Sequence, residues 1–178
     1  KGGELIASLE RVQAGISKVN AANSALAGKI AKLDPSSVGG AALPFRVELT
    51  RLEDFLGPLI GWLKSEKANH IVIFFENPSE MRPGGGFIGS YADVSILKGN
   101  IENIEVRDIN DSDRELAAKI IPPKPLQALV TRWRAADANW FFDFSESAAK
   151  VVSFLGESDL YKKRNIEFEG AIGLSANA

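Results

Sequence analysis

A heptad pattern over residues 5–33 is the feature that most constrains how this chain can fold. Its apolar side chains recur at alternating steps of four and three, and one polar residue takes a core position. The core positions are Leu5, Leu9, Val12, Ile16, Val19, Asn23, Leu26, Ile30 and Leu33. This spacing predicts one long helix that packs along a second helix. Gly15 and Gly28 each weaken the helix by about 1 kcal/mol relative to alanine, so it needs that partner.

A second apolar repeat supplies a partner within the same chain. After a breaker stretch at residues 34–44, which contains Pro35, Gly39 and Gly40, the spacing resumes at Phe45, Leu49, Leu52, Leu56, Leu59 and Leu63. The two repeats predict an antiparallel helical hairpin as a first domain, residues 1–66. The alternative is a coiled coil between chains, which would make the protein a homodimer through its N-terminal helix.

The remaining residues, 67–178, carry the pattern of an α/β domain. A continuous apolar run at 71–75 predicts a strand covered on both faces, and β-branched residues flanking Lys98, Gly99 and Asn100 predict a β-hairpin of strands 87–97 and 101–109. Further elements are expected as helices 112–120, 126–133 and 145–155, the last capped by Ser145 and stopped by Gly156, and a strand 168–174.

The predicted fold class is therefore α/β (α+β), with the N-terminal helical hairpin followed by a mixed sheet with a β-hairpin and covering helices. Because the chain stops just after a strand-like segment, we expect this domain to be truncated at its C-terminal end.

Composition excludes several classes of function. The chain has 21 basic and 23 acidic side chains, so no positive field favours nucleic acid as a partner. It has no cysteine and one histidine, which excludes thiolate sites and metal centres with several histidines.

A glycine-rich segment, Gly84 to Gly86, follows Arg82. With Gly89 it matches the spacing Gly-x-Gly-x-x-Gly, but the residues that follow favour a strand and not the helix that a dinucleotide site needs. One interpretation is a tight connection whose glycines supply positive φ angles. The other is a nest of backbone amides beside Arg82 that holds an anion.

Charged residues gather after the predicted hairpin and before the last helix, at Arg107, Asp108, Asp111 and Arg134. Arginine forks match phosphate oxygens, and aspartates suit Mg²⁺, so this set is typical of a phosphate site with a divalent ion. Ordinary surface ion pairs are the alternative.

The run from Phe75 to Tyr91 resembles the signature of the domain of unknown function 4012 family (DUF4012). Its companions are Val106-Arg-Asp108, the pair Pro122-Pro123, and Asp137-Ala-Asn-Trp140. The resemblance implies a bacterial, membrane-tethered protein whose domain faces outward from the cell. The anchor would lie outside this chain, with the two heptad helices between anchor and domain.

The order of strand, arginine with glycines, hairpin and Arg-Asp is also similar, more faintly, to the LytR-CpsA-Psr family. These enzymes transfer glycopolymers from polyprenyl-pyrophosphate carriers onto the cell wall. The similarity implies that Arg82 and Arg107 hold the pyrophosphate and that Asp108 helps to hold Mg²⁺, with Arg107 and Asp108 as catalytic residues. Together with the residue chemistry above, the candidate anion site comprises Arg82, Gly84, Gly85, Gly86 and Arg134, and the candidate metal ligands are Asp108 and Asp111. The departure from that family is the triple glycine, which replaces a more polar loop. The alternative function is a non-catalytic scaffold or binding module of the cell envelope.

Overall fold

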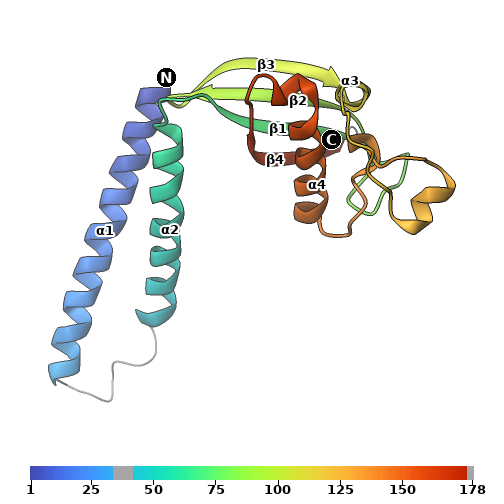
Figure 1. Cartoon of the computed structure of the whole chain (residues 1–178). Coiled ribbons are helices and arrows are strands. Elements are labelled where there is room, and N and C mark those ends of the chain that lie inside the picture. Colours follow the sequence, from blue (N-terminus) through green and yellow to red (C-terminus); the bar gives the residue numbers. More distant parts are fainter. Residues whose placement is uncertain (34–41, 176–178) are drawn as a thin grey trace. The chain divides into compact units, whose positions relative to one another are not determined.

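The computed structural model describes residues 1–33 and 42–175, which form two compact units (Figure 1). The first unit comprises residues 1–67 and the turn 97–100. The second comprises residues 68–96 and the chain from residue 101 onward. Most of the breaker stretch that separates the two heptad helices lies outside the described residues.

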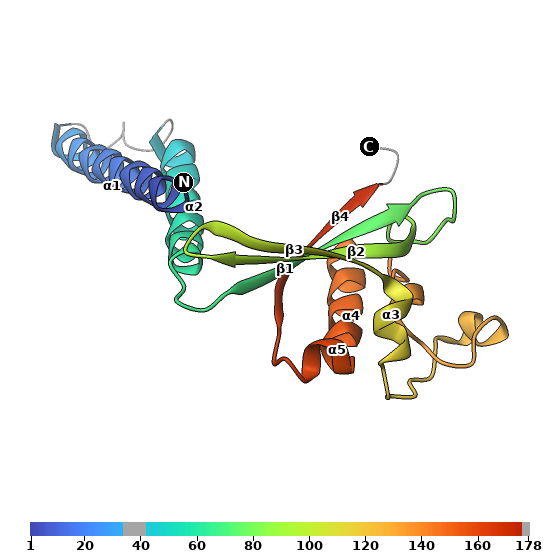
Figure 2. The same cartoon turned by 90° about the horizontal axis from the view of Figure 1, so that it is seen from above.

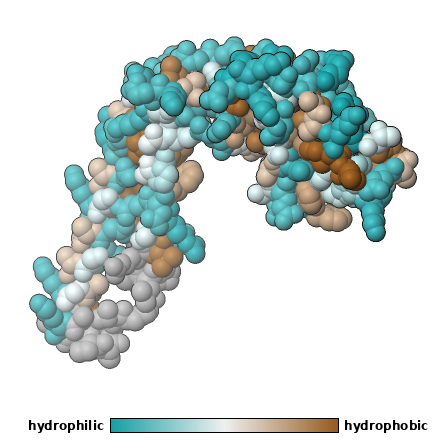
Figure 3. Space-filling model, in the orientation of Figure 1, coloured by the Kyte–Doolittle hydropathy of each residue, from teal (hydrophilic) through white to brown (hydrophobic). Residues whose placement is uncertain are grey.

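The helical unit is built from α1 (Gly2–Leu33) and α2 (Ala42–Leu63). Its pairing is antiparallel, because Asn20 of α1 donates to Glu53 at 2.6 Å while Glu10 of α1 pairs with Lys64 beyond the end of α2. Apolar residues buried in this unit include Ile6, Ile16, Leu56, Ile60 and Leu63. The predicted helical hairpin is confirmed. Figure 3 shows other apolar side chains exposed along these helices, in tan and brown.

The second unit contains a four-stranded sheet with the order β3-β2-β1-β4 (Figure 2). Its strands are β1 (Asn69–Asn77), β2 (Phe87–Leu97), β3 (Asn100–Asp108) and β4 (Phe168–Ser175). Strand β1 pairs antiparallel with β2 and parallel with β4, so the sheet is mixed. The predicted fold class is confirmed. The β2–β3 turn matches its sequence, because Lys98 and Gly99 both have positive φ, as a two-residue hairpin turn of type I′ requires.

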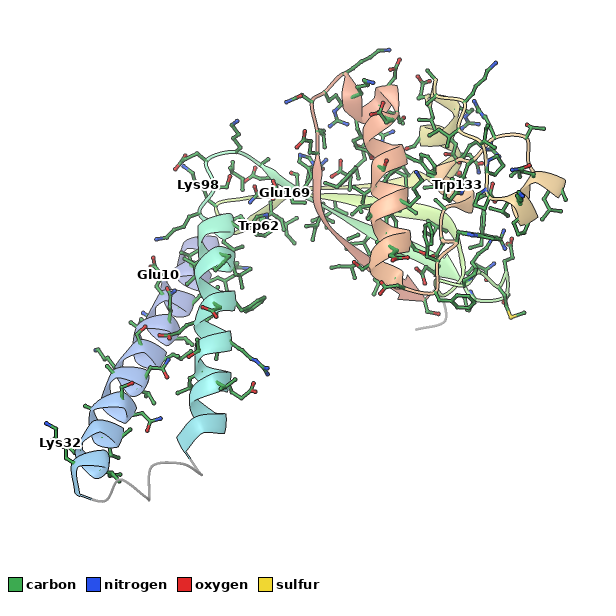
Figure 4. The ribbon with its side chains drawn as sticks, turned by 60° about the horizontal axis from the view of Figure 1, so that its bottom comes forward. Glu10, Lys32, Trp62, Lys98, Trp133 and Glu169 are labelled. Atoms are coloured by element: carbon green, nitrogen blue, oxygen red, sulfur yellow. The ribbon has the colours of Figure 1, made fainter. Side chains whose placement is uncertain are left out.

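Burial along β1 alternates, which corrects the expectation that both faces are covered. Val72, Phe74 and Glu76 are buried, whereas the intervening residues are half-buried. The covered face packs against α4 (Phe144–Glu157), whose buried side includes Val151, Phe154 and Leu155. Trp133, labelled in Figure 4, lies edge-on to Phe154 at 5.5 Å.

Three of the predicted helices differ from the observed ones. Helix α3 (Ile109–Arg114) replaces helix 112–120, because the chain beyond it is extended and Ile120 forms an isolated bridge with Trp133. The three prolines at 122, 123 and 125 leave only a short 3₁₀ turn, η1 (Lys124–Ala128), where helix 126–133 was expected. Helix α4 is capped by Asp143, which accepts from the Ser145 amide at 2.7 Å, and it continues through Gly156.

The remaining short elements are η2 (Ala135–Asp137) and α5 (Asp159–Lys162). Among the helices of the described residues, none is long and apolar enough to span a bilayer.

Candidate functional site

The glycine-rich loop is shaped by close packing. A Cβ on Gly84 would lie 1.8 Å from Oδ1 of Asn139, and a Cβ on Gly86 would lie 2.7 Å from the carbonyl oxygen of Asn77. Gly85 has φ of 129°, a conformation that residues with side chains rarely adopt. Only Gly85 has the positive φ that the first interpretation of this segment expected, whereas Gly84 and Gly86 are constrained by the close packing of neighbouring atoms.

The loop closes over a buried polar cluster, formed by Glu76, Asn139 and Ser147 and called here the Glu76 cluster. Nδ2 of Asn139 donates to the Gly86 carbonyl at 2.7 Å and to the Glu76 carboxylate at 3.4 Å. The Ser147 hydroxyl donates to the carbonyl of Phe141 at 3.1 Å and accepts from its amide at 3.0 Å. These bonds tie the end of β1, the glycine loop and the start of α4 together.

Glu76 is an acidic side chain in an apolar setting. It is 7% exposed, and burial raises the pKa of its carboxyl above the ordinary 4.5, although the hydrogen bond from Asn139 acts in the opposite direction. Because its pKa is raised in the folded state, its contribution to stability is fully present below pH 4.5 and is lost as the pH rises through the raised value.

We therefore expect Glu76→Gln to unfold at a higher urea concentration than the wild type at pH 7. This advantage should shrink as the pH falls toward 4.5, where Glu76 becomes protonated in both states. Urea unfolding of both chains at several pH values measures the difference, and contributions from other carboxyls common to both chains cancel. A difference that stays constant with pH, or that widens in acid, would contradict this assignment.

Arg82 makes its contacts at the surface of this loop. Its guanidinium lies 5.2 Å from the centre of the Phe87 ring, and Nη1 donates to the Met81 carbonyl at 3.0 Å. It therefore lies over the aromatic residue that begins β2.

Arg107 lies in a different place, at the end of β3. It lines a cleft of about 540 Å³, called here the arginine cleft, whose other basic side chains are Arg114, Lys163 and Arg164. Three acidic side chains, Asp111, Glu115 and Asp159, also line it. Nη2 of Arg107 pairs with Glu105, while its Nε is buried and has no hydrogen-bond partner.

The two predicted magnesium ligands are engaged in local structure. Asp108 caps α3, because its Oδ1 accepts from the backbone amide of Asn110 at 2.8 Å and from its side-chain amide at 2.9 Å. These hydrogen bonds lower the pKa of the Asp108 carboxyl. Asp111 pairs with Arg114. In residues 1–33 and 42–175 no group of three or more acidic or histidine side chains is placed to hold a metal ion.

Arg134 lies beside a third group, the buried Asp113. Asp113 is 1% exposed and accepts from the backbone amides of Ala135 at 2.8 Å and Ala136 at 3.1 Å. Burial raises the pKa of its carboxyl, and the nearby charge of Arg134 opposes this. Arg134 thus lies near the carboxylate that binds the first two backbone amides of η2.

The residues predicted to form one site therefore make contacts in separate places. Arg107 and Asp111 share the arginine cleft, whereas Arg82 and the three glycines contact Phe87 and the Glu76 cluster. The contacts described above for these two groups have no residue in common.

A model of the family described as protein of unknown function (DUF4012) matches residues 66–167, more than half of the chain. The chain belongs to the DUF4012 family. No curated protein and no solved structure matches it.

The span matched by the DUF4012 model contains the residues of both sites. It begins just before β1 and includes Glu76, Asn139 and Ser147 as well as all seven lining residues of the arginine cleft named above. Helix α1 and all of α2 precede it.

Sequence reasoning did not select several residues of these sites, some of which lie inside the recognised motifs and some of which do not. Glu76 and Asn139 stand inside the quoted signature runs, so the motifs contained a signal for them. Lys163 and Arg164 lie more than 50 residues from Arg107 and belong to no motif. Only the fold brings them to the cleft, where Arg164 lies 3.7 Å from Glu105 of β3.

Proposed function

We propose that this DUF4012 chain is an outward-facing domain of the bacterial cell envelope that binds a pyrophosphate-bearing ligand in the arginine cleft. The observation that carries the proposal is the convergence of four cations from separate elements. Arg107 comes from β3, Arg114 from α3, and Lys163 and Arg164 from the segment after α5.

The hydrogen-bonding state of these cations suits an anionic ligand. The Arg107 side chain is 22% exposed and lines the cleft, although its Nε is buried. A guanidinium has five N–H donors in a planar fork, which matches two phosphate oxygens at once. Four carboxylates balance the formal charge of these four cations. Lys163 pairs with Asp159 at 2.7 Å, Arg114 pairs with Asp111, Arg107 pairs with Glu105 and Arg164 lies 3.7 Å from the same Glu105, while Glu115 also lines the cleft. A doubly charged pyrophosphate would compete with these carboxylates for the same donors.

The chemical class of the ligand comes from the faint similarity to the LytR-CpsA-Psr family. On that similarity we propose a polyprenyl-pyrophosphate-linked glycan as the natural ligand. We further propose that the full-length protein is tethered to the membrane through a segment outside this chain, with the domain on the extracytoplasmic side.

A second candidate is the non-catalytic envelope scaffold. It is favoured by the structural roles of the glycine loop, which covers the Glu76 cluster, and of Asp108, which caps α3. In that function the charged residues of the arginine cleft would only form ion pairs with one another, and the protein would bind partners without catalysing a reaction.

Binding measurements on matched arginine variants separate these functions. We expect the wild type to bind inorganic pyrophosphate and a short-chain polyprenyl pyrophosphate in isothermal titration calorimetry. Arg107→Gln should weaken both by at least about tenfold, since a hydrogen bond to a charged group contributes about 1.5–3 kcal/mol. Arg82→Gln is the matched control, because it removes the arginine beside the glycine loop and should leave the affinity unchanged.

The remaining outcomes each contradict the proposal in a defined way. If Arg82→Gln lost affinity and Arg107→Gln did not, the ligand would bind at the glycine loop. If the wild type bound neither compound, the scaffold function would replace the proposal.

A further inference from the structure

The two heptad helices leave a set of large apolar side chains exposed. On α1, Leu5, Val12, Val19 and Leu26 are between 45% and 56% exposed, and they recur every seven residues. On α2, Leu52 is 41% and Phe55 is 62% exposed. Half of the predicted heptad core of α1 is therefore not covered by α2.

These residues lie on one side of the hairpin, as the contact between α1 and α2 and the geometry of the helices establish. Asn20 of α1 contacts Glu53 of α2 at 2.6 Å. Val19 and Leu52 are the residues immediately before these two, each turned by about 100° from the contact. Two antiparallel helices are related by a twofold axis that runs perpendicular to the plane containing both of them. This axis exchanges the helices but does not exchange the two sides of the pair. The residues that precede the contacting residue in each helix therefore lie on the same side.

The opposite side of the hairpin has a different character. The residues that follow the contacting ones are Ala21 on α1 and Asp54 on α2, and Ala14 lies one heptad before Ala21; all three are exposed. Apart from Val47, which is 46% exposed, the second side carries small or charged side chains, whereas the first carries most of the large exposed apolar ones. We call the first side the apolar face, defined by Leu5, Val12, Val19, Leu26, Leu52 and Phe55.

From this asymmetry we infer that the apolar face binds the same face of a second copy of this chain, so that two hairpins form a four-helix bundle. The inference is independent of the proposed ligand site. The defining residues of the face include no charged side chain, so self-association buries no charge at these positions.

The size of the face suits a stable dimer. Helix α2 has 22 residues and is about 33 Å long, and two adjacent helices are about 20 Å wide. The projected area is about 600 Å², close to the roughly 800 Å² that each partner buries in a standard interface.

The charges of the two helices favour one arrangement of the copies. Helix α1 carries four basic and two acidic side chains, whereas α2 carries two basic and three acidic ones. A twofold axis parallel to the helices places α1 of one copy over α2 of the other, so that helices of opposite net charge are adjacent. In this arrangement every adjacent pair of helices is antiparallel, as in a simple four-helix bundle.

Sedimentation equilibrium on the chain at about 100 μM tests the inference. We expect twice the monomer mass for the wild type, the monomer mass for Val19→Asp, and twice the monomer mass for the matched control Ala21→Asp. Both aspartates lie at exposed positions of the same helix, so circular dichroism should report equal helix content. A monomeric wild type, or an equal effect of the two aspartates, would overturn the inference.

A second measurement avoids any loss of folding that an aspartate causes. The chain has no cysteine, so single cysteines can be placed at will. We expect a short bis-maleimide to link Val19→Cys into a covalent dimer and to leave Ala21→Cys unlinked. Equal linking of the two variants would show that the copies do not meet through this face.

Discussion

Replacement of Asp113 by alanine is expected to lower the free energy of unfolding by about 2–5 kcal/mol, the largest loss that we predict for this chain. The side chain is 1% exposed and accepts from two buried backbone amides, those of Ala135 and Ala136. Alanine would leave both amides without a partner, and each unsatisfied buried donor costs about 1–3 kcal/mol. Arg134 would also lose the carboxylate that lies nearby.

Urea unfolding at pH 7 measures this loss, and two further variants isolate its cause. Asp113→Asn keeps one acceptor oxygen, so its loss should be smaller than that of alanine. Asp111→Ala removes a partly exposed carboxylate from the same short helix, where it pairs with Arg114, and should change stability by at most about 1 kcal/mol. If Asp111→Ala were as costly as Asp113→Ala, the effect would belong to α3 in general and not to the buried amides.

The helical unit could be predicted from the sequence because its information is local. The alternating steps of four and three identify α1 directly, and the second repeat identifies its partner α2. What the pattern could not specify is how many core positions the partner covers. The heptad gives Leu9 and Val12 equal rank, yet Leu9 is half-buried and Val12 is exposed on the apolar face.

The segment from residue 109 to 137 could not be predicted, because long-range contacts decide its conformation. Local preference favoured helix beyond Ser112, but the Trp133 amide donates to the Ile120 carbonyl at 2.7 Å and holds that stretch extended. Asp113, which lies inside the predicted helix, accepts from amides more than 20 residues away. No window of the sequence contains both partners of these bonds.

The candidate sites show the same division between local and distant information. The glycine loop was recognised as a tight connection, and the positive φ of Gly85 is a property of that single residue. The reason for glycine at position 84 became visible only from Asn139, which is distant in sequence but whose Oδ1 would lie 1.8 Å from a Cβ there. Likewise Arg107 was selected from the sequence, while Lys163 and Arg164 became its neighbours only through the fold.

Replacement of Gly84 by alanine tests whether the glycine loop is shaped by packing, and it should cost about 2–4 kcal/mol. The added Cβ would lie 1.8 Å from Oδ1 and 2.7 Å from Cγ of Asn139, so that fully buried side chain must move. Its movement would break the hydrogen bond that Nδ2 donates to the Gly86 carbonyl. Urea unfolding measures the cost, and Gly156→Ala is the matched control. Gly156 lies within α4 with open space around it, so its replacement should stabilise the chain by up to about 1 kcal/mol.

A double-mutant cycle with Asn139→Ala separates this steric conflict from a general intolerance of the loop. Asn139→Ala alone removes the buried amide and should destabilise the chain, but it also removes the two atoms closest to the Gly84 Cβ position and leaves only Ser147 Oγ, at 2.9 Å, to adjust. Adding Gly84→Ala to that variant should then cost less than about 1 kcal/mol, which corresponds to a coupling energy of at least 1 kcal/mol between the two positions. If Gly84→Ala were equally costly in both backgrounds, the backbone conformation of the loop, and not contact with Asn139, would require glycine at this position.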